Sequence, residues 1–193
     1  MSDTREIGVL YTEHARLAAR TPVSSLWSYE TCARGRDRRS VAIDGEGNHE
    51  YWLDRCDPLL NTILPGTGVS IILNLGDRWA AGRSLSSSEV LPPACIVGPV
   101  TQARILRVGR FVRAIGAGFS PTLAPVVAGV PASELVDRIV PLDDLWAADD
   151  VERMFARISS LEIRQGVLAV KRELTRASAG RRGMTGGARP SPG

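Results

Sequence analysis

The sequence contains few residues of the types that build redox or metal sites. Its three cysteines, Cys32, Cys56 and Cys95, form no CxxC pair. An odd number of widely spaced cysteines favours a reducing compartment over a disulfide framework. His14 and His49 are the only histidines, whereas a mononuclear metal site needs two or three convergent histidines with thiolate or carboxylate help. We therefore expect no metal, no cofactor and a cytoplasmic location.

Long hydrophobic runs are also missing. The longest apolar stretches, Val69–Leu75 and Ala124–Val130, are far too short to cross a bilayer. The first twenty residues contain acidic side chains and no apolar core of the kind that a signal peptide needs. These observations predict that the chain does not have a membrane as a partner.

Lysine is nearly absent, and positive charge is unevenly distributed. Lys171 is the only lysine beside 23 arginines, a bias that a GC-rich genome also explains. Residues 171–193 carry six basic residues and one acidic residue, a net charge of +5. Because the formal net charge of the whole chain is +3, the other residues sum to −2. The basic pI of 9.0 therefore belongs to the C-terminal segment. A basic segment of this kind can touch nucleic acid without sequence preference.

Short strand-like stretches separated by turn residues fill residues 26 to about 120. Asp44-Gly45 and Gly47-Asn48 are turn signals that predict a hairpin between the second and third stretches. Many short strands with frequent turns are typical of an antiparallel sandwich or barrel. The predicted strands are Leu26–Thr31, Val41–Ile43, His49–Leu53, Asn61–Leu64, Val69–Leu75, Ala94–Val97, Val100–Val108 and Phe111–Phe119.

Helical signals follow the strands. Ser120-Pro121 and Gly129 frame a short helix at Thr122–Ala128, and Pro131 opens a second at Ala132–Arg138. A longer helix follows Asp149-Asp150, with Val151, Met154, Phe155 and Ile158 at helical spacing.

Farther along, a heptad-like stripe recurs at i, i+4, i+7 and i+11: Ile163, Val167, Val170 and Leu174. Such a stripe packs inside the chain or forms a dimer seam, and the sequence leaves both open. Residues 178–193 are rich in Gly, Arg and Pro, and we expect a disordered basic tail.

Motifs of familiar enzyme classes are missing: there is no GxSxG, HExxH or GxxxxGK[ST]. Gly66-Thr67-Gly68 and Gly116-Ala117-Gly118 are better explained as turn or close-packing glycines than as phosphate-binding loops. Asp143, Asp144, Asp149 and Asp150 form the main acidic cluster, which suits acid–base chemistry or helix starts. Acids ahead of a helix usually cap it and complement its dipole, so we favour helix starts. We expect no catalytic residues and no enzyme.

Four stretches of the chain, in order, resemble strings in the N-terminal domain of AraC-type transcriptional regulators. Thr62–Asp77 (TILPGTGVSIILNLGD) resembles the family's signature, which contains ILPDG and NLGD. Val97–Thr101 (VGPVT) also has a counterpart in the family. Ile115–Thr122 (IGAGFSPT) is similar to the family's GVRFRPGG. Val130–Trp146 (VPASELVDRIVPLDDLW) resembles PxxELTDRVVPLDDLWG almost residue for residue. Leu26–Tyr29 falls where the family has a short aromatic strand.

The resemblance implies an α+β fold: a cupin-like antiparallel barrel or jelly roll followed by helices, acting as a sensor and dimerisation module. It divides the chain into a sensor domain (1–146), amphipathic helices (147–177) and the tail (178–193). The chain departs from the family pattern in three ways. Gly66 and Ser70 replace two acidic residues, and the segment Arg34–Leu60 is longer than the corresponding segment of the family. The metal-binding cupin pattern is missing. Only 47 residues follow Trp146, without a helix-turn-helix pattern, so we expect no specific DNA binding by this chain alone.

The resulting hypothesis is a ligand-sensing module with a small-molecule effector inside the barrel. The candidate wall residues are Trp27, Tyr29, Ile72, Asn74 and Phe119, and the stripe from Ile163 to Leu174 is the candidate seam of a homodimer or of a dimer with a partner regulator. Two alternatives are a small cupin-type enzyme such as an isomerase, and a remnant that titrates a full-length regulator through mixed dimers.

Overall fold

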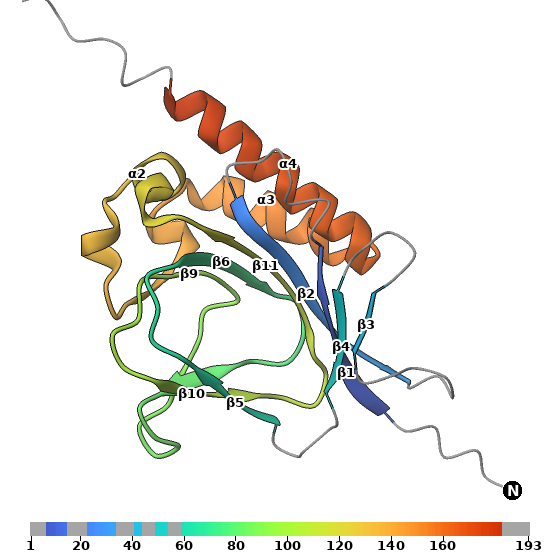
Figure 1. Ribbon diagram of the computed structural model, residues 1–193. Helices are drawn as coiled ribbons and strands as arrows, with labels where there is room; N and C mark the ends of the chain where they lie inside the picture. The colour runs from blue at the N-terminus through green and yellow to red at the C-terminus, as the bar shows by residue number, and fades with distance from the viewer. Residues whose placement is uncertain (1–6, 15–22, 34–40, 44–48, 54–58, 183–193) are drawn as a thin grey trace, which may run out of the picture.

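The computed structural model describes residues 7–14, 23–33, 41–43, 49–53 and 59–182. In this part of the chain, two antiparallel sheets and the helices after them form a mixed α+β fold (Figure 1). The larger sheet has the strand order β12-β9-β6-β11-β2-β1-β4-β3, and the smaller sheet has the order β5-β10-β7-β8. The strands of the larger sheet are, in chain order, β1 (Ile7–Glu13), β2 (Val23–Ala33), β3 (Val41–Ile43), β4 (His49–Leu53), β6 (Val69–Asn74), β9 (Ala94–Val97), β11 (Arg113–Phe119) and β12 (Ile139–Pro141). Those of the smaller sheet are β5 (Leu59–Ile63), β7 (Ala80–Gly82), β8 (Glu89–Val90) and β10 (Arg104–Val108).

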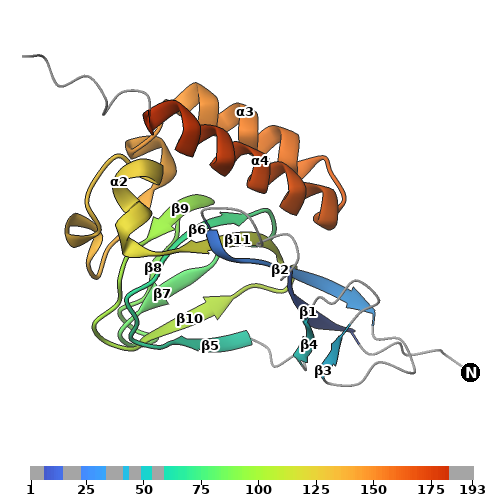
Figure 2. The same ribbon diagram turned by 45° about the horizontal axis from the view of Figure 1, so that its top comes forward.

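The helices lie together on the outer face of the larger sheet, opposite the smaller sheet (Figure 2). Three short 3₁₀ helices connect the strands and helices: η1 (Pro121–Leu123), η2 (Ala132–Leu135) and η3 (Leu142–Asp144). The α-helices are α2 (Ala124–Val127), α3 (Ala148–Ser159) and α4 (Ile163–Arg182). Among the described helices, none combines the length and the hydropathy required to cross a membrane.

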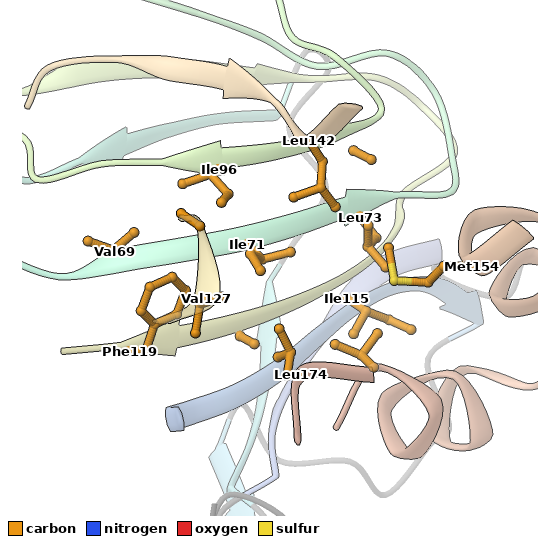
Figure 3. Packing of buried hydrophobic residues seen from close by; sticks show 14 of the residues in the cluster. Val69, Ile71, Leu73, Ile96, Ile115, Phe119, Val127, Leu142, Met154 and Leu174 are labelled. Atoms are coloured by element: carbon orange, nitrogen blue, oxygen red, sulfur yellow. The ribbon is translucent and has the colours of Figure 1, made fainter. Parts of the chain in front are cut away.

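Alternation along the central strands separates two apolar layers. In β6, Val69, Ile71 and Leu73 point towards the helices, where Ile115 and Phe119 of β11 join them (Figure 3). These side chains are at most 2% exposed. The intervening residues of β6 and β11 face the smaller sheet, because successive side chains of a strand point to opposite sides.

The stripe on α4 packs inside the chain. Val167, Val170 and Leu174 are buried in the layer between helices and sheet, and Ile163 packs against its margin. Met154 and Ile158 of α3 belong to the same layer. These α4 side chains are therefore already covered by the chain's own sheet, and a dimer formed through them would require α4 to leave that sheet.

Most predicted strands are confirmed, several with the same bounds, and β3 and β4 pair antiparallel as the hairpin prediction requires. The turn at 44–48 lies outside the described residues. The sequence reading missed β1, β7, β8 and β12, each of which is short or lacks clean alternation.

Two helix boundaries differ from the prediction. The expected helix Ala132–Arg138 is a single 3₁₀ turn, because Val136 is extended and Asp137 adopts a φ of 55°. The helix expected to end by residue 177 continues to Arg182, and the remainder of the predicted tail lies outside the described residues. By contrast, Ser120 is the N-cap of η1, as predicted: its side chain accepts a hydrogen bond from the backbone N–H of Thr122, and Pro121 is the first residue of η1.

A clasp between the segments at 98–104 and 135–138 fixes the edge of the larger sheet. Asp137 accepts hydrogen bonds from the backbone N–H of Thr101 (2.9 Å) and from its hydroxyl, and the guanidinium of Arg104 donates to the Asp137 carbonyl. The hydrogen bonds from Thr101 lower the pKa of Asp137, so the carboxylate stays charged. Gly98 donates to the Arg138 carbonyl at 3.0 Å. The clasp joins two of the strings that carry the family resemblance.

Gly98 tests the clasp. A Cβ at this position would lie 1.8 Å from the Leu135 carbonyl oxygen. We expect Gly98→Ala to lower the free energy of unfolding by about 3 kcal/mol, since backbone must move to relieve the overlap. Gly68→Ala is the matched control, because nothing lies within 4 Å of its Cβ. Urea unfolding measures both, and equal stability of the two variants would contradict the clasp.

Arg113 fastens the turn between α3 and α4 to the sheet. Its guanidinium donates to the carbonyls of Ser159 (3.0 Å) and Leu161. Glu30 is the cross-strand partner of Arg113 and lies on the same face. Burial raises the pKa of Glu30; the nearby Arg113 charge opposes this rise, and Glu162 adds to it.

A raised pKa means that the charged form of Glu30 costs stability at neutral pH. We expect Glu30→Gln to stabilise the protein at pH 7 by a few tenths of a kcal/mol, since solvent screens a half-buried group. The gain in stability should vanish below the ordinary pKa of 4.5, because Glu30 is then protonated in both the folded and the unfolded state. It should grow as the pH rises through the raised pKa of the folded state. Urea unfolding at several pH values checks this against the exposed control Glu152→Gln. A gain that persists unchanged at low pH would contradict the electrostatic cause.

Candidate ligand-binding site

Aromatic side chains gather on the inner face of the larger sheet, towards the smaller sheet. In β2, Trp27 and Tyr29 alternate with Leu26 and Ser28, which face the helices, and Tyr11 of β1 is paired with Tyr29. Trp79, just before β7, completes the group from the opposite side. We call Tyr11, Trp27, Tyr29 and Trp79 the aromatic wall.

Tyr29 is the centre of the aromatic wall. Its ring centroid lies 4.9 Å from that of Tyr11, 5.3 Å from that of Trp27 and 6.2 Å from that of Trp79. The planes of Trp27 and Trp79 are steeply inclined to Tyr29, at 77° and 85°. Edge-to-face pairs of this kind hold rings in fixed orientations. Tyr11, Trp27 and Tyr29 stay half-buried.

Small residues of β11 make room for the wall. Gly116 is the cross-strand partner of Trp27, and a Cβ on it would lie 2.0 Å from a carbon of the indole ring. The indole therefore lies directly over the backbone of β11. Ala114 is opposite Tyr29 in the same way, and Gly118 is opposite Ser25. The prediction of close-packing glycines at 116–118 is confirmed.

Trp79 contributes a polar atom without a partner. The side chain is 3% exposed, and its indole Nε1 is buried with no hydrogen-bond acceptor. A buried donor left unpaired costs roughly 1–3 kcal/mol, so such a group is unusual in a native protein and is often satisfied by a ligand or water.

Two ionisable groups of this face stay neutral at physiological pH. Burial raises the pKa of Tyr29 above its ordinary 10.0, and raises the pKa of Cys95 to about 12. Cys95 is the cross-strand partner of Ile72 and is almost fully buried. Because the thiolate is the reactive form, Cys95 does not suit nucleophilic catalysis.

Four of the five predicted wall residues share the inner face by strand register: Trp27, Tyr29, Ile72 and Asn74. Asn74 ends β6 and is committed to the turn after it, since its amide donates to the Asp77 carbonyl at 2.7 Å and its Oδ1 accepts from Gly76. Phe119 lies on the opposite face, buried among Val127 and other residues under the helices (Figure 3). The structure does not bring Phe119 to the aromatic wall.

Sequence reasoning missed Tyr11 and Trp79. Tyr11 lies in β1, whose sequence IGVLYTE shows little alternation, and Trp79 lies between the Gly76-Asp77 pair and β7. Neither position carries a local signal of an inward side chain. Their contribution depends on the pairing of β1 with β2 and on the approach of the smaller sheet.

The acidic cluster serves the helices. Asp143 and Asp144 lie in the first turn of η3, and Asp149 and Asp150 lie in the first turn of α3, all exposed. No side chain caps α3 by a hydrogen bond, so these acids act on it through the helix dipole. Asp150 also pairs with Arg153. Within the described ranges, no three His, Cys, Asp or Glu residues converge as metal ligands would.

The comparisons with known proteins give one family match. Residues 49–141 match a family described as Domain of unknown function (DUF6597). No curated protein and no solved structure matches the chain. The matched segment contains the clasp, β6 and β11, but Tyr11, Trp27 and Tyr29 of the aromatic wall precede it.

Gly116 tests the packing of the wall. We expect Gly116→Ala to displace the Trp27 indole, to weaken the near-ultraviolet circular dichroism of the aromatic rings and to lower the free energy of unfolding by about 1–3 kcal/mol. Gly66→Ala is the control, since the nearest atom to its Cβ lies at 4.0 Å. An unchanged aromatic spectrum in Gly116→Ala would show that Trp27 does not lie over β11.

Proposed function

We propose that this chain binds a small-molecule effector at the aromatic wall, as the sensing module of an AraC-type transcriptional regulator. The single observation that carries the binding proposal is the buried, unpaired Nε1 of Trp79, whose ring centroid lies 6.2 Å from that of half-buried Tyr29. Rings supply apolar area and stacking, and one convergent donor fixes orientation, which is the usual composition of a small-molecule site.

The regulator assignment rests on the four resemblance strings. Two of them, Val97–Thr101 and Val130–Trp146, meet in the clasp, and Thr62–Asp77 contains the central strand β6. A sequence signature that makes such specific contacts supports a shared architecture. We therefore propose that the two sheets form a cupin-like barrel, with the aromatic wall on its inner surface.

We further propose that the module works in the cytoplasm, as a homodimer or in a dimer with a partner regulator, and that the chain alone does not read DNA sequence. The described helices α3 and α4 commit their apolar sides to the sheet, whereas a recognition helix must be free to enter the major groove. Dimerisation would use a surface other than the buried α4 stripe.

A ligand screen tests the proposal. The purified full chain is heated with a broad library of sugars, fatty acids, aromatic acids and amines. An effector at one hundred times its Kd should stabilise the fold by about 2.7 kcal/mol and raise Tm. Trp79→Phe keeps a ring and removes the donor, so it should weaken binding; Trp146→Phe is the control, because its Nε1 donates to Val127 away from the wall.

The outcomes are distinct. A hit that depends on Trp79 and not on Trp146 supports binding at the wall. No shift with any chemical class, or a hit unaffected by Trp79→Phe and Gly116→Ala, would overturn it. Sequence-selective DNA binding by the chain alone in a gel-shift assay would overturn the assignment as a sensing module without a reader.

A further inference from the structure

The described charge on the inner face of the larger sheet has one sign, which is negative. Glu13 is the cross-strand partner of Trp27, so its carboxylate starts from the same face as the indole. Among the described inner-face side chains of this sheet, Glu13 is the only charged one: the others are aromatic, aliphatic, hydroxyl or amide groups, Cys95 and glycines. The large sheet thus presents one negative charge and no described positive charge beside the wall.

The facing sheet does not reverse this balance. Arg104 occupies an inner-facing position of β10 but is engaged by Asp137, with 3.8 Å between guanidinium and carboxylate and a further hydrogen bond to the Asp137 carbonyl. The Arg113 guanidinium belongs to the opposite face of the larger sheet, where it binds the turn between α3 and α4. The described cation at an inner-facing position of β10 is therefore committed to Asp137 and is not free for an anionic ligand.

The rings themselves favour positive charge. The faces of Trp and Tyr carry negative potential, and a cation within about 6 Å of a ring centroid is attracted to it. Tyr11, Trp27 and Tyr29 are half-buried, and their planes are inclined to one another by 38° to 77°. Tyr29 and Cys95 remain neutral, since burial opposes their ionisation, and so add no negative charge of their own.

Trp79 sets the second requirement. Its unpaired Nε1 is a donor only, because indole nitrogen has no acceptor capacity. A ligand that satisfies it must bring an oxygen or nitrogen acceptor. A simple alkylammonium ion meets the first requirement and not the second.

We infer that the effector class is an organic cation with an apolar shell, such as an alkylated ammonium, carrying a hydrogen-bond acceptor. This inference rests on the proposed function, since it names the ligand class for the same aromatic wall. The cation lies against the rings on the side of Glu13, and the acceptor receives the Trp79 N–H.

Matched probes separate charge from shape. Acetylcholine carries a quaternary ammonium and an ester acceptor; its neutral carbon isostere, 3,3-dimethylbutyl acetate, has nearly the same shape. Isothermal titration of the full chain should show acetylcholine binding at least about tenfold more tightly than the isostere, because only the cation gains from the ring faces. Tetramethylammonium, which lacks an acceptor, should bind more weakly than acetylcholine.

Three variants locate the effect. Glu13→Gln should reduce the preference for the cation over the isostere while leaving isostere binding unchanged. Trp79→Phe should abolish the advantage of acetylcholine over tetramethylammonium. Trp146→Phe, away from the wall, should leave all ratios unchanged. Circular dichroism and Tm of each variant establish that it is folded.

The failures are distinguishable. If the isostere or an anionic aromatic binds as tightly as the cation, or if only sugars, fatty acids or aromatic acids raise Tm in the screen, the inference fails and the proposed function stands. If no small molecule of any class binds, both fail. A cation preference that survives Glu13→Gln and Trp27→Leu would overturn the assignment to the aromatic wall.

Discussion

The structure depends on the two-sided burial of the central strands β2, β6 and β11. Each must satisfy a helix-facing layer and a sheet-facing layer at once, because the pleat sends alternate side chains to opposite sides. On β11 the division is sharp: Ile115 and Phe119 fill the layer below the helices, whereas the inner positions 114, 116 and 118 hold only alanine and glycine. A larger residue at position 116 would collide with the ring of Trp27.

This division explains which interactions are available for binding. The helix-facing layer is closed: Val167, Val170 and Leu174 complete it, and its residues are almost fully buried. The inner face instead combines a half-buried group of rings with an unsatisfied indole donor. Burial of apolar area stabilises the first layer, while the second retains polar and ring surface that packing within the described chain does not use. The proposed effector site therefore lies on the inner face.

Sequence patterns predicted the order of strands and helices because alternation, turn residues and caps are local signals. Val69–Asn74 and Ala94–Val97 were found for that reason, as was the start at Ser120-Pro121. Periodicity does not distinguish two buried faces of a strand, so Phe119 was placed with Trp27 although it lies on the other side. The helix expected at 132–138 failed because Asp137 leaves the helical region to reach Thr101, a contact that is 36 residues distant in sequence.

The same distinction limits what a family resemblance can say about a ligand. The resemblance strings supply structural contacts: Gly98 and Asp137 form the clasp, and Trp146 donates to Val127 under the helices. Tyr11 and Trp79 of the wall lie outside the resemblance strings, whereas Trp27 and Tyr29 fall in Leu26–Tyr29, where the family has a short aromatic strand. The proposed effector class is therefore argued from Glu13, Trp79 and the rings of this chain and not from the resemblance.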